Sequence, residues 1–196
     1  MTHCRRARGA GGASRRHPDR RAESRSVVVL GIDPGLANLG YGVVRRGGGR
    51  LVALDGGVIR TTAGVAPERR LHDLQERVAA LLAEHAPQAV AMESLYFGQN
   101  VRTAFAVGQA RGVVLAAAGA SGIPCFDYTP QQVKGAVCGS GRAAKDQVTR
   151  MVQALLSLPP EPLADHAADA LAVGICHINH APVRGAAQEA MAGAGR

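Results

Sequence analysis

The chain carries, at positions 26–35, the stretch Ser-Val-Val-Val-Leu-Gly-Ile-Asp-Pro-Gly, in which a short apolar run ends at Asp33. A run of this kind is typical of a buried strand. A carboxylate at the end of a buried strand is costly unless it is paired or bound to a cation. The stretch therefore predicts a central strand that delivers an acid to a site.

Acidic residues border short apolar runs at two further places. Glu93 ends the run 89–92, and Asp165, His166 and Asp169 open an otherwise apolar stretch. Taken singly, such residues are often a turn residue, a surface acid or a helix cap. Three such placements in one small chain instead favour carboxylates gathered around a divalent metal, the arrangement that two-metal phosphodiester chemistry requires.

The predicted elements surrounding these acids alternate in a characteristic order. A Gly-Gly-Gly turn at 47–49 joins the second and third strands into a hairpin, and Thr129-Pro130-Gln131-Gln132 reads as a capping box that opens a helix. Strands are predicted at 27–32, 39–46, 51–60, 89–92 and 123–128. Helices are predicted from Pro67 to before Pro87, at 100–120, from Pro130 to near 139, at 143–158 and from 164 to about 180.

A hairpin followed by parallel crossovers predicts an α/β fold with a mixed five-stranded sheet flanked by helices, which is the ribonuclease H-like order. The first and fourth strands then lie side by side at the centre of the sheet. Asp33 and Glu93 are therefore expected to face each other. The last helix is expected to cross that edge and present its first turn, with Asp169, to the same site.

Charge is distributed unevenly along the 196 residues, whose formal net charge is +8. Residues 1–26 hold eight arginines against Asp19 and Glu23, a net +6, while the remainder holds fifteen basic and thirteen acidic residues, a net +2. We expect a disordered Arg-rich leader over 1–26, one nuclease domain over 27–181 and a flexible tail over 182–196. The near-neutral body means that nucleic-acid binding must be argued from local patches.

The composition excludes several other classes of protein. No apolar stretch is long enough for a membrane-spanning helix, and the leader lacks the apolar core of a secretory signal. The four cysteines are scattered and form no C-x-x-C pair, which argues against structural zinc and favours reduced thiols. We therefore expect a cytoplasmic protein with no membrane partner.

Five motifs, in order, resemble those of the RuvC family of Holliday-junction resolvases. The resemblance extends from about Val28 to His180. The motifs are Gly31-Ile32-Asp33-Pro34-Gly35 with Gly40-Tyr41-Gly42, then Glu93-Ser94-Leu95-Tyr96-Phe97-Gly98-Gln99-Asn100, Gly108-Gln109-Ala110-Arg111-Gly112, Thr129-Pro130-Gln131-Gln132-Val133-Lys134 and Ala167-Ala168-Asp169-Ala170-Leu171-Ala172.

The resemblance implies an Mg²⁺-dependent endonuclease that acts in DNA recombination and repair as a homodimer on four-way junction DNA. It implies two Mg²⁺ ions in each active site, with Mn²⁺ able to substitute, and a branch-migration complex with the RuvA and RuvB proteins. Asp33, Glu93 and Asp169 match the family's metal-binding acids.

The fourth ligand of the family lies three residues before the last acid, and this position is His166. Helical spacing alone does not decide between the neighbours, because residues three and four positions away both lie near Asp169. By resemblance we assign His166 as catalytic residue and metal ligand. We expect Asp165 to be the N-terminal cap of the helix, with a supporting role in the site left open.

Basic and aromatic residues near these motifs are predicted to hold DNA. Lys134, Arg142 and Lys145 lie on or beside helix beginnings, where phosphate contacts are favoured. Arg102 and Arg111 lie on the helix after Glu93; any one of these basic residues could instead be part of a solvated face. Two aromatic residues, Tyr96 and Phe97, lie just beyond the second acid and before Gly98. They are placed to stack on an unpaired base, although Phe97 fits the core equally well.

Two other functions fit part of the pattern. An actin/Hsp70-type phosphate-binding ATPase also opens with Gly-Ile-Asp, but that fold needs two duplicated halves and this chain has the length for one. A catalytically silent junction-binding protein would have no reason to keep a full set of buried acids. The sequence therefore favours the nuclease.

Overall fold

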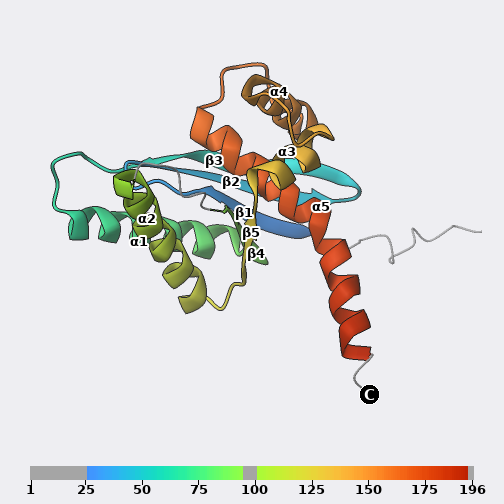
Figure 1. Ribbon diagram of the computed structural model, residues 1–196, viewed down its shortest axis with the longest axis horizontal. Coiled ribbons are helices and arrows are strands. Elements are labelled where there is room, and N and C mark those ends of the chain that lie inside the picture. The colour runs from blue at the N-terminus through green and yellow to red at the C-terminus, as the bar shows by residue number, and fades with distance from the viewer. Residues whose placement is uncertain (1–25, 95–100, 194–196) are drawn as a thin grey trace, which may run out of the picture.

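The computed structural model of the protein describes residues 26–94 and 101–193. A five-stranded sheet in the order β3-β2-β1-β4-β5 forms its centre (Figure 1). The strands are β1 (Val27–Asp33), β2 (Asn38–Gly47), β3 (Arg50–Arg60), β4 (Ala89–Glu93) and β5 (Cys125–Tyr128). β1 pairs antiparallel with β2 and parallel with β4, which confirms both the α/β class and the predicted ribonuclease H-like arrangement.

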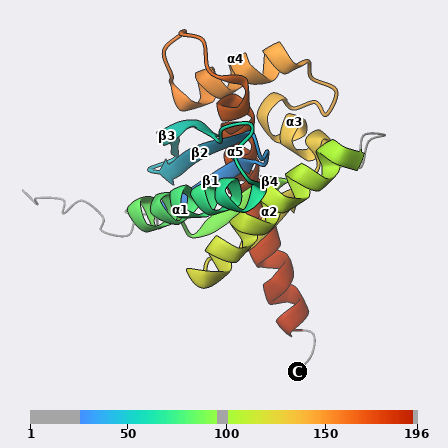
Figure 2. The same cartoon turned by 90° about the vertical axis from the view of Figure 1, so that its left-hand side faces the viewer.

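Helices cover both faces of the sheet and form a three-layer molecule. They are α1 (Pro67–His85), α2 (Val101–Ala120), α3 (Pro130–Cys138), α4 (Lys145–Leu156) and α5 (Asp165–Gly193). The first two helices pack on one face, and the last three lie on the other (Figure 2). Thr129 caps α3 through the predicted capping box, with Gln132 returning the hydrogen bond.

Alternation along the central strand determines which side chains meet which layer. Leu30 and Ile32 of β1 belong to the core under α1 and α2, whereas Val29 belongs to the core under α3, α4 and α5. Because successive side chains of a strand point to opposite faces, Gly31 and Asp33 lie on the same face as Val29. The acid that ends β1 is therefore delivered to the layer that contains α5.

Glycines on this face let α5 lie directly on the sheet. A Cβ atom built on Gly31 would lie 2.0 Å from the carbonyl oxygen of Ala170, and one on Gly40 would lie 2.0 Å from the carbonyl oxygen of His166. Both contacts are with helix backbone, so neither can be relieved by moving a side chain. The Gly-x-Gly motif of β2 therefore sets how closely the first turns of α5 approach the acids.

Several element ends differ from the predicted ones. β5 begins at Cys125 rather than 123, and α4 begins at Lys145 rather than 143. The last helix was expected to end near His180, but α5 continues to Gly193 and its final turns extend away from the sheet (Figure 1). The predicted leader lies outside the described residues except for its last residue, Ser26.

Two further observations concern the described part of the chain. Cys125 and Cys138 are free thiols. None of the helices in the described ranges is long and apolar enough to cross a membrane.

Candidate active site

Asp33 and Glu93 end two neighbouring parallel strands. The last paired residues of β1 and β4 are Ile32 and Met92, so the two acids follow at the same edge of the sheet. Ala91 packs in the core beside α5, and by the two-residue period Glu93 points to that face too. The strand register thus brings together two carboxylates that lie far apart in sequence.

The N-terminal end of α5 adds His166 and Asp169 to this edge. The His166 Nδ1 atom lies 2.6 Å from the Asp33 Oδ2 atom, a hydrogen bond between the helix and the end of β1. Asp169, one turn later, is close enough to Asp33 and Glu93 for their charges to interact. The structure therefore places all four predicted metal-site residues at one edge of the sheet.

Burial and mutual repulsion shift the titration of two of these acids. Desolvation, followed by the charges of Asp33 and Asp169, raises the pKa of Glu93, while Lys134 opposes the shift. Desolvation also raises the pKa of Asp169, with Lys145 acting against it and Asp33 adding to it. The cluster is thus a place where negative charge is crowded and poorly hydrated.

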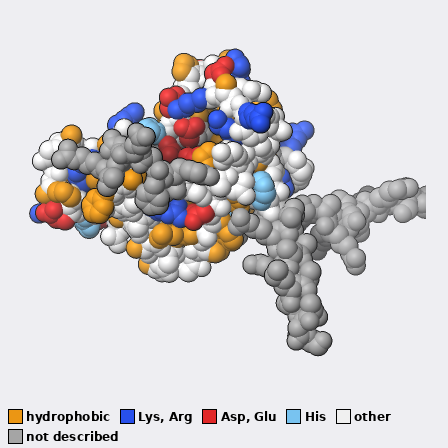
Figure 3. All heavy atoms as spheres, viewed as in Figure 1, with side chains coloured by type: hydrophobic (Ala, Val, Ile, Leu, Met, Phe, Trp, Pro, Cys, Tyr) orange, Lys and Arg blue, Asp and Glu red, His pale blue; other side chains and the backbone are white. Residues whose placement is uncertain are grey.

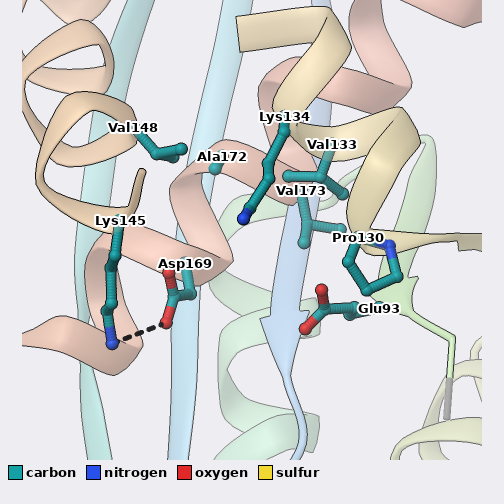
Figure 4. Close-up of a pocket in the computed structure, with 9 residues that line it drawn as sticks. All are labelled: Glu93, Pro130, Val133, Lys134, Lys145, Val148, Asp169, Ala172 and Val173. Carbon is teal, nitrogen blue, oxygen red and sulfur yellow. Dashed lines mark ion pairs between the residues drawn. The ribbon is translucent and has the colours of Figure 1, made fainter. Parts of the chain in front are cut away.

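Lys145, the first residue of α4, forms ion pairs with two acids of α5. Its Nζ atom lies 3.1 Å from Asp165 Oδ2. It also lies 3.4 Å from Asp169 Oδ2, and Figure 4 shows this second ion pair. The hydrogen bond to Asp165, and the charge of Asp169, raise the pKa of Lys145, so its ammonium group stays charged. Lys145 therefore balances part of the negative charge of the site.

The expected helix cap at Asp165 is wrong. α5 begins at Asp165 itself, and the backbone amides of Ala167 and Ala168 donate to the carbonyl of Ala164, which occupies the position before the helix. The Asp165 carboxylate pairs with Lys145 instead. The sequence pattern Asp-His-x-x-Asp is compatible with either a helix cap or an ion pair at Asp165, because it gives no information about a partner from α4.

An open pocket of about 190 Å³ lies beside the acids. Glu93 and Asp169 form its acidic side, Lys134 and Lys145 project into it from α3 and α4, and apolar side chains such as Val133 line the rest (Figure 4). In the space-filling view, acidic side chains gather in a hollow with basic side chains beside them (Figure 3). A polyanion could approach such a rim while a cation lies between its phosphate and the acids.

The donor chemistry of the cluster fits a hard divalent cation. Carboxylate oxygens are preferred ligands of Mg²⁺, and imidazole nitrogen binds many divalent metals. Among residues 26–94 and 101–193, no three such side chains already stand close enough together to hold an ion. In this state Asp169 is paired with Lys145 and Asp33 with His166. Desolvation and then repulsion raise the pKa values of Glu93 and Asp169, and a divalent cation would relieve that repulsion.

Only some of the predicted DNA-binding residues are described, and two of them line this pocket. Lys134 and Lys145 line it, and Arg142 is exposed in the turn before α4. Tyr96 and Phe97 lie outside the described residues, and Arg102 belongs to α2 but its side chain is not described. DNA contact by these residues stays a prediction.

Arg111 has protein partners that the sequence did not reveal. Its Nη2 atom lies 2.5 Å from both carboxylate oxygens of Asp127, and its Nη1 atom donates to the carbonyl oxygen of Glu93 at 3.4 Å. Only 16% of its side chain is exposed. Asp127 was missed because a single acid in a short strand is ordinarily a solvated residue. The available signal was its position next to Tyr128, since neighbouring strand residues point to opposite faces of the sheet.

Comparisons with known proteins agree with the fold and the motifs. The family model described as "Crossover junction endodeoxyribonuclease RuvC" matches residues 29–177. A crossover junction endodeoxyribonuclease of Pelotomaculum thermopropionicum is 49% identical over 154 residues, which cover 79% of this chain and 94% of that protein.

Solved structures give the same result. The structure of Thermus thermophilus RuvC superposes with a TM-score of 0.74 at 39% identity, covering 80% of this chain and 96% of that one. The same protein in complex with a Holliday junction substrate also gives a TM-score of 0.74, at 37% identity over 80% and 96% of the two chains. The match to the family model, over residues 29–177, includes the edge of the sheet where Asp33, Glu93, His166 and Asp169 lie.

Proposed function

Because the chain belongs to the RuvC family of crossover junction endodeoxyribonucleases, we propose that it cuts opposed strands of four-way DNA junctions with the residues gathered between β1, β4 and α5. The observation that carries this proposal is the convergence of three acids and a histidine from distant parts of the sequence. Basic residues border the same pocket. An acidic centre inside a basic rim is what metal-dependent hydrolysis of a phosphodiester needs.

Asp33, Glu93, His166 and Asp169 are the residues that would hold the metal. The family is metal-dependent, and we propose Mg²⁺, two ions in each site, with Mn²⁺ able to replace it. When bound, the metal supplies charge neutralisation at the phosphate and a more acidic water as nucleophile. Because the carboxylates repel one another, the positive charge of a bound cation would stabilise their arrangement.

His166 is fixed by Asp33 so that one ring nitrogen stays available. When Nδ1 carries the proton and donates it to Asp33 Oδ2, the Nε2 atom keeps a free lone pair. That lone pair can bind a metal or accept a proton from the attacking water. In either role the ring must be neutral, and the carboxylate of Asp33 orients it.

The basic residues of the rim are proposed to hold the DNA backbone. Lys134 and Lys145 line the pocket beside Glu93 and Asp169, and the exposed Arg142 lies in the turn between α3 and α4. When a phosphate or a metal enters, the ammonium group of Lys145 can exchange its pairing with Asp169 for one with the phosphate. Tyr96 is proposed to stack on an unpaired base of the junction, with Phe97 and Arg102 as further candidate contacts.

A homodimer is proposed because two opposed cuts require two sites. α2 presents Phe105, 69% exposed, and Leu115, 40% exposed. Gly108 and Gly112 of the same helix have open space where a side chain would stand, which permits close approach by another helix. We further propose a branch-migration complex with the RuvA and RuvB proteins as the cellular partner.

A synthetic four-way junction incubated with the protein and Mg²⁺ tests the function. We expect symmetric nicks that Asp33→Asn abolishes without loss of junction binding. Binding without nicks by the unaltered protein would instead identify a silent junction-binding protein. ATP hydrolysis independent of DNA would revive the phosphate-binding ATPase.

A further inference from the structure

Arg111 connects the ends of two strands from the side of the sheet opposite the acidic site. It projects from α2, whose buried residues Ala110 and Val114 pack in the core shared with α1. Its guanidinium group contacts the end of β4 at the Glu93 carbonyl and the end of β5 at Asp127. These contacts come from the face of the sheet that α2 covers, whereas the Glu93 carboxylate points to the opposite face, towards α5.

The alternation of β5 explains why Asp127 is available to this arginine. Tyr128 is fully buried in the core on the α5 side, so its neighbour Asp127 points to the α2 side. Asp127 accepts from Arg111 with both oxygens, while 48% of its own side chain remains exposed. The pair therefore joins a largely buried cation to an acid at the surface.

The backbone at Glu93 lies where the pairing of β4 with β5 ends, so contacts from other elements help to fix it. Glu93 is the last residue of β4 and pairs with Tyr128, and the amide of Ser94 donates to the Tyr128 carbonyl at 2.8 Å. The carbonyl of Glu93 accepts from Arg111, as does the sulfur of buried Met92 at 3.9 Å. One side chain thus contacts both of the last two residues of β4.

The chemistry of this contact calls for arginine. A guanidinium group is planar and carries five donors in a fixed fork, so it can bind a carboxylate and a carbonyl together. A lysine has one compact ammonium group and reproduces the charge but not this geometry. Partial burial of Arg111 makes the geometry matter more than it would at an exposed pair.

We propose that Arg111 is a positioning residue that, anchored by Asp127, fixes the backbone at Glu93 and so holds the Glu93 carboxylate in the metal-binding arrangement. This inference rests on the proposed function and replaces the expected DNA contact of Arg111. It assigns the pair no contact with metal or DNA. Its effect is transmitted through the backbone of one residue.

Three variants test the proposal: Arg111→Lys, Arg111→Gln and Asp127→Asn. Calorimetry with Mn²⁺ and no DNA reports metal binding directly, and single-turnover junction cleavage at several Mg²⁺ concentrations reports its consequence. We expect Arg111→Gln to weaken Mn²⁺ binding and slow cleavage by about ten- to a hundredfold, the range seen when groups that orient metal ligands are removed. Asp127→Asn should weaken Mn²⁺ binding and slow cleavage as well, but by less. Arg111→Lys should be as impaired as Arg111→Gln in both measurements.

Junction affinity and its salt dependence separate this role from a phosphate contact. We expect both to be unchanged in all three variants, since no phosphate contact is lost. A lower affinity and a shallower salt slope in Arg111→Gln, together with normal Mn²⁺ binding in Asp127→Asn, would overturn the proposal and restore the DNA contact. The Asp127→Asn variant is decisive because it keeps the arginine's charge and removes only the anchor.

An exposed ion pair on α4 supplies the control variant. Arg150→Gln removes an exposed ion pair with Asp146 on α4 and should leave Mn²⁺ binding unchanged. If Arg111→Gln fails to fold in a thermal melt, Asp127→Asn and Arg111→Lys carry the comparison. Failure of the unaltered protein to cleave junctions would refute the proposed function, whereas normal cleavage and normal metal binding by all three variants would refute the positioning role alone.

Discussion

His166 shows how one hydrogen bond limits what a side chain can do. Its Nδ1 atom is hydrogen-bonded to Asp33 at 2.6 Å, while 45% of the side chain remains exposed to solvent. Asp165, next to it, points to Lys145 and is 76% exposed. The two neighbours therefore differ, since His166 is hydrogen-bonded to Asp33 and Asp165 forms a surface ion pair.

We expect His166→Ala to abolish cleavage, with a loss of at least about a hundredfold, while junction binding remains. Asp165→Ala should reduce cleavage only severalfold, because an exposed ion pair contributes little. Single-turnover cleavage and a gel-shift assay measure the two properties. The reverse ranking, with Asp165→Ala inactive and His166→Ala active, would transfer the catalytic role to Asp165.

The raised pKa of Glu93 predicts how stability changes with pH in the metal-free protein. The folded state takes up a proton at a higher pH than the unfolded state does. The charged carboxylate therefore destabilises the fold above its folded pKa, and this cost disappears as the pH falls to the ordinary value of a glutamate. Replacing the charge should remove the cost.

We expect Glu93→Gln to raise Tm at neutral pH without metal. The difference in Tm from the unaltered protein should shrink as the pH falls towards the ordinary pKa of a glutamate side chain. Adding Mg²⁺ at neutral pH should shrink it as well, because the cation stabilises only the protein that keeps the acid. Thermal melts with a chelator and with Mg²⁺ measure both effects. A difference in Tm that is independent of pH would show that desolvation and repulsion at Glu93 do not act as inferred.

At the scale of elements, the close contact of β2 with α5 predicts the effect of a single methyl group. Gly40→Ala would place its Cβ 2.0 Å from the His166 carbonyl oxygen, so the first turn of α5 must move. We expect a loss of roughly 1–3 kcal/mol of stability and a loss of cleavage, since His166 moves with the turn. Denaturant melts and junction cleavage measure these.

A matched control for Gly40→Ala lies on the neighbouring strand. A Cβ on Gly56 would have ordinary contacts, the nearest at 3.6 Å from the Leu171 side chain. Gly56→Ala should therefore keep cleavage and most of its stability. Equal losses in the two variants would point to a general intolerance of alanine in this sheet rather than to the displacement of α5.

The elements show which structural features a sequence can reveal. The strand order and the capping box at Thr129 were predicted because period, turn residues and caps are local signals. The convergence of Asp33 and Glu93 followed from that order. The pairing of Asp165 with Lys145, and of Arg111 with Asp127, was missed because each joins two elements whose relative placement depends on packing rather than on local pattern.

At the scale of the whole molecule, the described chain offers one acidic centre, whereas the proposed function requires cuts on two strands of a junction. The described surface of α2 carries exposed Phe105 beside glycines with open space, as a helix that packs against a second copy would. A dimer with two sites would nick both strands within one bound complex. The two cuts therefore become separable when one site is disabled.

We expect a tagged mixed dimer of one unaltered protomer and one Asp33→Asn protomer to nick the junction on one strand only, because each site cuts its own strand. The unaltered dimer should yield linear duplex products, and the doubly substituted dimer none. Denaturing gels of junctions labelled on each strand measure this, with sedimentation at the same concentration to establish the dimer. Two opposed cuts by the mixed species, or sedimentation as a monomer that still resolves junctions, would show that one site serves both strands.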